Sequence, residues 1–110
     1  MVGMLDQYPH YLYRDTEEGW TLVGRCREET NGKGGHIKAA DAEYYLYSSL
    51  VQMPVATPKI PEGVEVVVSG RELEPDELLD PQPLVEEGTI RIKGTCAKFD
   101  PGRLHNRMWV

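Results

Sequence analysis

Residues 19–28 read Gly-Trp-Thr-Leu-Val-Gly-Arg-Cys-Arg-Glu, and the alternation in this stretch decides the fold class. One set of alternate positions holds Trp20, Leu22, Gly24 and Cys26, and most of the intervening positions are polar or charged. A period of two is typical of a β-strand that buries one face. The stretch therefore predicts a strand whose Trp20, Leu22, Gly24 and Cys26 side faces the core.

Similar patterns on both sides of this stretch extend the prediction to the whole chain. We expect further strands over residues 8–14, 36–39, 42–53, 64–68, 89–94 and 104–110. Residues 31–35 are expected to form a flexible glycine loop, 40–42 a hairpin turn, and Pro101-Gly102 the turn into the last strand. The 110 residues suit one domain. The sequence thus predicts a single all-β domain over 1–110, a small antiparallel β-barrel or sandwich of six or seven short strands.

Residues 71–88 interrupt the β pattern with three prolines and with seven acidic residues against one basic residue. Proline prevents continuous strand pairing, and an insertion of this length is typically functional or disordered. We predict a long, solvated acidic loop with a helical turn after Pro75, held on the barrel by Leu78 and Leu79. Its net charge of −6 equals that of the whole chain, whereas residues 89–110 have a net charge of +4.

Composition excludes several classes of protein. An acid excess argues against an autonomous nucleic-acid binder with a basic surface. No apolar run approaches the roughly 18 residues that cross a membrane, and residues 1–8 lack the pattern of a secretory signal, so no membrane association is expected. Cys26 and Cys96 are predicted to be reduced and buried, with a disulfide between them as the alternative.

No catalytic, cofactor-binding or metal-ligating residue is predicted. His10, His36 and His105 are widely spaced and lack metal-ligand spacing, and no serine lies in a nucleophile elbow. A proline-broken loop is a poor place to hold an acid–base carboxylate pair. An enzyme or metal protein that uses the histidines is the weaker of two alternatives.

The other alternative comes from the aromatic residues. Six tyrosines and two tryptophans are present, with tyrosines clustered in residues 8–13 and 44–47. In an OB-like barrel such side chains stack on single-stranded nucleic acid, with Arg25 and Arg27 as basic neighbours. Aromatic residues also fill cores and protein interfaces. The scarcity of nearby basic residues favours core and interface, and an OB-like single-strand-binding module is retained as the alternative.

The order of features along the chain carries a resemblance. The segments concerned are 8–13 (YPHYLY), 25–29 (RCREE), the glycine loop 31–35, 39–41 (AAD), 44–49 (YYLYSS), 61–66 (PEGVEV), 88–91 (GTIR) and 102–110 (GRLHNRMWV). In this order and size the chain resembles the small β-barrel proteins that complete the head–tail junction of tailed phages and prophages.

The resemblance implies a non-enzymatic head–tail connector or head-closure subunit, with no catalytic residues and no cofactor. It implies self-assembly into a ring beneath the portal, contacts with portal or tail proteins, and a long loop facing the channel through which DNA passes without specific binding. The expected location is the virion or the cytoplasm of a bacterium carrying the prophage.

Because ring contacts join two different surfaces, we expect the acidic loop and the basic end to act as those surfaces. The acidic residues concerned are Glu72, Glu74, Asp76, Glu77 and Asp80, and the basic ones are Arg91, Lys93, Arg103 and Arg107. The alternative role of the loop is an acidic channel lining that repels DNA. Met108-Trp109-Val110 is expected to pack in the fold or pair with a neighbour.

Overall fold

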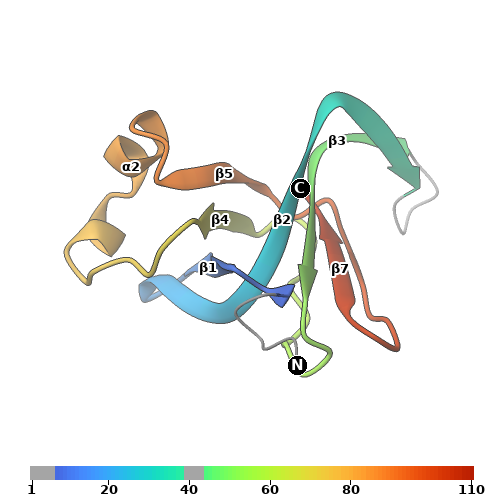
Figure 1. Ribbon diagram of the computed structural model, residues 1–110, viewed down its shortest axis with the longest axis horizontal. Coiled ribbons are helices and arrows are strands. Elements are labelled where there is room, and N and C mark those ends of the chain that lie inside the picture. The colour runs from blue at the N-terminus through green and yellow to red at the C-terminus, as the bar shows by residue number, and fades with distance from the viewer. Residues whose placement is uncertain (1–6, 39–43) are drawn as a thin grey trace.

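The computed structural model describes residues 7–38 and 44–110, with side chains described over 7–30 and 49–110. Seven strands form one curled antiparallel sheet in the order β5-β4-β1-β2-β3-β7-β6 (Figure 1). They are β1 (His10–Thr16), β2 (Gly19–Lys38), β3 (Tyr44–Met53), β4 (Glu65–Ser69), β5 (Ile90–Thr95), β6 (Lys98–Asp100) and β7 (Asn106–Trp109). The predicted all-β fold class is confirmed, and the sheet curls into a half-barrel.

One long strand and one short connection link the two halves of the curled sheet. The first half of β2 pairs with β1 and its second half pairs with β3, so this strand passes from one half of the sheet to the other. The connection from β5 to β6 also passes from one half of the sheet to the other, because β5 and β6 are its two outer strands. The N–H of Cys96 donates to the carbonyl of Val64 (2.9 Å), and the N–H of Ala97 donates to that of Trp109 (2.8 Å). The two outer strands are thereby joined through one bend.

Two apolar clusters lie on opposite sides of the sheet, because successive side chains of a strand point to opposite faces. The main cluster contains Leu12, Cys26, Val51, Met53, Ile60, Val66, Val68, Cys96 and Met108. The second contains Tyr13, Val67, Leu73, Leu84 and Ile90. Met108 is therefore part of the chain's own core, and Val110 pairs with Ser49 through two backbone hydrogen bonds.

The predicted single inward face of residues 19–28 is wrong at Trp20, which packs against the second cluster, and at Leu22. Leu12 lies opposite Gly24 and Tyr13 lies opposite Leu22, so Val23 is an extra residue in β2. A bulge of this kind reverses the alternation beyond it. Val23 consequently packs against the main cluster, and Leu22 is 43% exposed. Gly24 has a φ of 156°, a conformation that residues with a side chain rarely adopt.

The predicted glycine loop over 31–35 is also wrong. β2 continues from Gly19 to Lys38, and the glycines coincide with a shift in its pairing with β3 between Thr30 and Gly35. The expected strand 36–39 is the end of this long strand. The expected turn over 40–42 lies outside the described residues.

A short strand and two short helical segments complete the described structure. β6 was not predicted, and residues 101–105 form the turn that leads into β7. Within 71–88 lie a 3-10 turn, η1 (Glu77–Leu79), and one short helix, α2 (Gln82–Glu86). No helix in the described ranges is long and apolar enough to cross a membrane.

Candidate functional site: two oppositely charged ends

The acidic loop is an ordered part of the structure. Leu73 and Leu84 are buried in the second apolar cluster, beside Tyr13 and Ile90. The backbone N–H of Leu73 donates to the hydroxyl of Tyr13 at 2.8 Å. Leu73 and Leu84 thus anchor the loop to the sheet, while six of its seven acidic residues remain exposed.

An ion pair fixes the 3-10 turn η1 in the middle of this loop. Arg71 donates through Nη1 and Nη2 to the two carboxylate oxygens of Glu77, at 2.9 and 2.7 Å. Oε1 of Glu77 also accepts the backbone N–H of Glu74 at 2.8 Å. The hydrogen bonds from Arg71 and Glu74 lower the pKa of Glu77 to about 2. Glu77 is thus committed to holding the turn.

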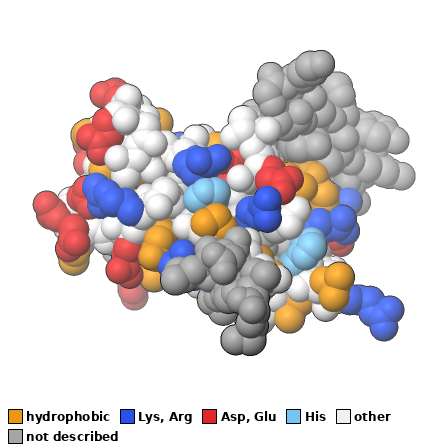
Figure 2. Space-filling model, in the orientation of Figure 1, with side chains coloured by type: hydrophobic (Ala, Val, Ile, Leu, Met, Phe, Trp, Pro, Cys, Tyr) orange, Lys and Arg blue, Asp and Glu red, His pale blue; other side chains and the backbone are white. Residues whose placement is uncertain are grey.

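The other predicted acidic residues are exposed, and one leucine of the same loop is exposed with them. Leu78 packs against the second cluster as predicted, but Leu79 is 86% exposed, so the prediction that it holds the loop down is wrong. The remaining predicted acids, Glu72, Glu74, Asp76 and Asp80, are all exposed. We call residues 74–80 the acidic tip. At one end of the molecule, where acidic side chains gather, it combines the exposed Leu79 with exposed acidic residues (Figures 1 and 2).

The four predicted basic residues are divided between two places. On β5, Arg91 pairs with Glu28, and the ammonium of Lys93 donates to Gln82 of α2 at 3.4 Å. Both side chains therefore make contacts within the chain. Arg103 and Arg107 lie in or beside the turn between β6 and β7, and Arg107 pairs with Asp100 at 3.2 Å. The structure does not bring the four residues together.

We call residues 101–107 the basic loop. Gly102, Arg103, Leu104, His105 and Arg107 surround a hollow of about 250 Å³. Leu104 is 85% exposed, which makes Leu79 and Leu104 the most exposed large apolar side chains in the described part of the chain. Figure 1 places this loop at the opposite end of the long axis from η1.

A buried asparagine holds the basic loop in place. The Nδ2 of Asn106 donates to the carbonyls of Val55 (3.3 Å) and Thr57 (3.1 Å), and its Oδ1 accepts the N–H of Gly102 at 3.3 Å. A Cβ at Gly102 would collide with the carbonyl oxygen of His105. The turn thus requires glycine at 102 and asparagine at 106.

Sequence reasoning missed a buried carboxylate. The Glu28 side chain is 0% exposed and accepts hydrogen bonds from Ser49 (2.6 Å), Thr30 (2.7 Å) and the Nε of Arg91 (2.8 Å). Burial acts to raise the pKa of Glu28, but these hydrogen bonds outweigh it and hold the pKa below its usual value. These hydrogen bonds link β2, β3 and β5 through the carboxylate. Because the carboxylate is fully buried, a substrate cannot reach it.

His10 lies beside this carboxylate. Its Nδ1 accepts the backbone N–H of Glu28 at 3.1 Å. Burial, and then the charge of Arg91, lower the pKa of His10. The His36 side chain is outside the described residues, and His105 lies in the basic loop. Over the described residues, no group of three or more His, Cys, Asp or Glu side chains is arranged to hold a metal ion.

Both cysteines are buried free thiols in the main cluster. Burial raises the pKa of Cys26 to about 12 and that of Cys96 to about 11. At neutral pH both remain protonated, and the thiolate is the reactive form of cysteine. The prediction of reduced, buried cysteines is confirmed, and neither thiol is placed for nucleophilic chemistry.

The residues that an OB-like module would use are engaged within the chain. The Arg25 guanidinium lies 4.0 Å from the centre of the Tyr11 ring and donates to the Tyr11 hydroxyl (2.6 Å) and the Tyr8 carbonyl (3.1 Å). Arg27 pairs with Glu29 at 3.5 Å. The side chains of residues 44–47 lie outside the described set. Base stacking on Tyr11 would require Arg25 to leave its position over the ring.

No protein-family model, curated protein or solved structure matches this chain.

Proposed function

We propose that this protein is a non-enzymatic structural subunit that assembles with copies of itself into a ring. The proposal extends to the class that the sequence resembles, the head–tail connector or head-closure proteins of tailed phages and prophages. Its neighbours would be portal or tail proteins, in the virion or in the cytoplasm of a bacterium carrying the prophage.

One observation carries the proposal. Leu79 and Leu104 are almost equally exposed, and the segments that contain them, η1 and the basic loop, lie toward opposite ends of the molecule. Exposed acids precede and follow Leu79 in the chain, while Arg103 and Arg107 line the same hollow as Leu104. Each end thus combines an exposed leucine with charged residues of one sign, and the sign at one end is opposite to the sign at the other. Such complementarity fixes register and speeds encounter between partners.

The placement of the two ends determines the kind of assembly. If two copies met through the same end, charges of the same sign would face each other. The acidic tip of one copy against the basic loop of the next instead gives a head-to-tail contact, which forms a closed ring when the rotation between copies closes. Acidic residues that such a contact leaves uncovered would repel the phosphate backbone of DNA passing through the ring.

The rigidity of both ends supports this contact. The Arg71–Glu77 pair and the Tyr13–Leu73 hydrogen bond hold the acidic tip, and Asn106 holds the basic loop. Little conformational entropy is then lost when the two ends meet, because their backbones are already ordered.

Light scattering on the purified protein tests this function, alone and with portal or tail components. We expect a mass that is a multiple of the 12.4 kDa chain and that falls as salt screens the contact. Glu62→Lys, an exposed acid outside both ends, is the matched control and should leave the mass unchanged. A 12.4 kDa monomer under all conditions that binds neither component would contradict the proposal.

A further inference from the structure

Arg14 has a buried nitrogen that lacks a hydrogen-bond partner. This residue lies on β1 between Thr21 of β2 and Val66 of β4. Its Nε has no acceptor, and no other described side chain has a buried nitrogen or oxygen in this condition. Leaving a buried charged donor without an acceptor is unfavourable. A shift of the side chain that brings this Nε to an acceptor of a bound ligand would remove that penalty.

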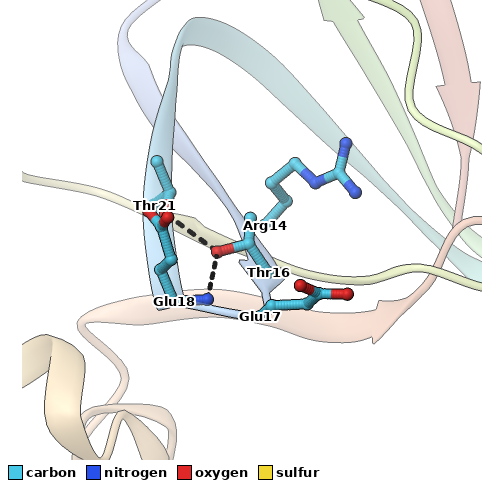
Figure 3. A pocket seen from close by; sticks show the side chains of 5 residues that line it. All are labelled: Arg14, Thr16, Glu17, Glu18 and Thr21. Atoms are coloured by element: carbon cyan, nitrogen blue, oxygen red, sulfur yellow. Dashed lines mark hydrogen bonds between the residues drawn. The ribbon is translucent and has the colours of Figure 1, made fainter.

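Two adjoining hollows share Arg14 and Thr21. The inner hollow, of about 250 Å³, reaches the connector between β3 and β4 at Lys59 and Ile60. The outer hollow, of about 400 Å³, lies over the turn between β1 and β2 and is lined by Glu17 and Glu18 (Figure 3). Figure 3 shows the Arg14 side chain extending away from this turn. Glu17 and Glu18 line only the outer hollow and Lys59 lines only the inner one, so the outer hollow is the more acidic of the two.

The inner hollow combines cations with an apolar wall. Arg14 and Lys59 supply positive charge and Thr21 a hydroxyl, while Leu22, Val23 and Ile60 supply apolar surface. The bulge at Val23 contributes to this wall, because it turns Val23 toward the main cluster and Ile60.

This combination selects a class of ligand. A guanidinium fork matches the two oxygens of a carboxylate, and a nearby ammonium adds attraction. The apolar wall favours an aliphatic group attached to that carboxylate over a hydrated anion such as phosphate. Glu17 and Glu18 disfavour an anion in the outer hollow, so the carboxylate belongs in the inner one.

We propose that the inner hollow binds a carboxylate carried on a small aliphatic group, with Arg14 and Lys59 as its charged contacts. The site is separate from the acidic tip and the basic loop, so it stands or falls independently of the assembly.

Nuclear magnetic resonance on the full chain tests the site, with N-acetyl-leucine as the probe. The Nε–Hε signal of Arg14 should shift in a saturable way, together with the amides of Thr21 and Ile60. N-acetyl-leucinamide, which lacks the carboxylate, should bind at least about tenfold more weakly, because it loses a charge-assisted contact. Inorganic phosphate should also bind more weakly, because it makes no apolar contact.

Variants separate a specific site from general attraction to positive charge. Arg14→Met should abolish the saturable shifts, and Lys59→Met should weaken them several-fold while leaving the fold intact, because Lys59 is exposed. Arg27→Met removes an equal, exposed charge outside the hollows, the acidic tip and the basic loop, and it should leave the binding unchanged. Absence of a saturable shift at Arg14, equal binding of the amide or of phosphate, or an equal effect of Arg27→Met would overturn the proposal.

Discussion

The hydroxyl of Tyr13 accepts a hydrogen bond from the backbone N–H of Leu73, sixty residues further along the chain, at 2.8 Å. Both residues are buried. The bond ties the start of the acidic loop to β1, in the middle of the sheet. It accounts for an ordered segment where three prolines and seven acids interrupt the strand pattern.

Removing this hydroxyl should loosen the acidic tip. Tyr13→Phe leaves a buried N–H without its partner, which costs about 1–3 kcal/mol in unfolding free energy. Hydrogen exchange at Leu73 and through the acidic tip should accelerate by more than exchange in β7. Tyr11→Phe removes a hydroxyl that bonds to Arg25 and is the matched control. Equal exchange rates at the acidic tip in the two variants would show that the bond does not hold this segment.

The buried carboxylate of Glu28 should stabilise the junction of β2, β3 and β5. Glu28→Gln preserves the size of the side chain but removes the charge that three donors share. Hydrogen bonds to charged groups contribute about 1.5–3 kcal/mol, and we expect a loss of that order in urea unfolding. Glu29→Gln, at an exposed neighbouring position, should stay within about 0.5 kcal/mol of the parent protein.

The same carboxylate should make stability depend on pH. The pKa of Glu28 is lower in the folded chain than its ordinary value, which is about 4.3 in the unfolded chain. Its contribution is therefore complete above that value and is lost as the pH falls through the folded pKa. Urea unfolding at pH 7 and at successively lower pH should show the parent protein and Glu28→Gln converging in acid. A constant difference between them would rule out this linkage.

The two cysteines should be unreactive in the folded protein. Because burial raises the pKa of Cys26 to about 12 and of Cys96 to about 11, almost no thiolate is present at pH 8. A colorimetric thiol reagent should therefore detect two thiols per chain only after unfolding in guanidinium. Rapid reaction of either thiol in the folded protein would contradict the burial described for the main cluster.

The fold class was predictable because strand alternation is a local property. The predicted strand over 64–68 corresponds to β4, and Ile90 packs inward while Arg91 and Lys93 stay exposed. The face of Leu22 could not be predicted, because it depends on how β2 pairs with β1 around Val23. Gly24 was the only local signal of that bulge.

The candidate surfaces were predictable in charge but not in detail. The sequence located the negative and positive segments, yet which acids remain exposed depends on Arg71 capturing Glu77. The Glu28 cluster required contacts with Ser49 and Arg91, which are 21 and 63 residues away. The exposed leucines emerged only when the partners of Leu73, Leu78 and Leu84 were known.

Head-to-tail assembly makes a specific prediction for two complementary variants. Asp76→Lys with Leu79→Lys removes the exposed leucine of the acidic tip and reduces its net charge from −4 to −1, without touching the Arg71–Glu77 pair. Arg103→Glu with Leu104→Asp reverses the basic loop without touching the Arg107–Asp100 pair. Each variant retains one intact end, so either one alone should be monomeric.

Sedimentation velocity of the parent protein, of each variant and of their equimolar mixture tests head-to-tail assembly. We expect an oligomer larger than a dimer for the parent protein, monomers for each variant, and only a dimer for the mixture. The dimer forms because the intact basic loop of one variant meets the intact acidic tip of the other. A monomeric parent protein, or variants that assemble as the parent does, would contradict head-to-tail assembly.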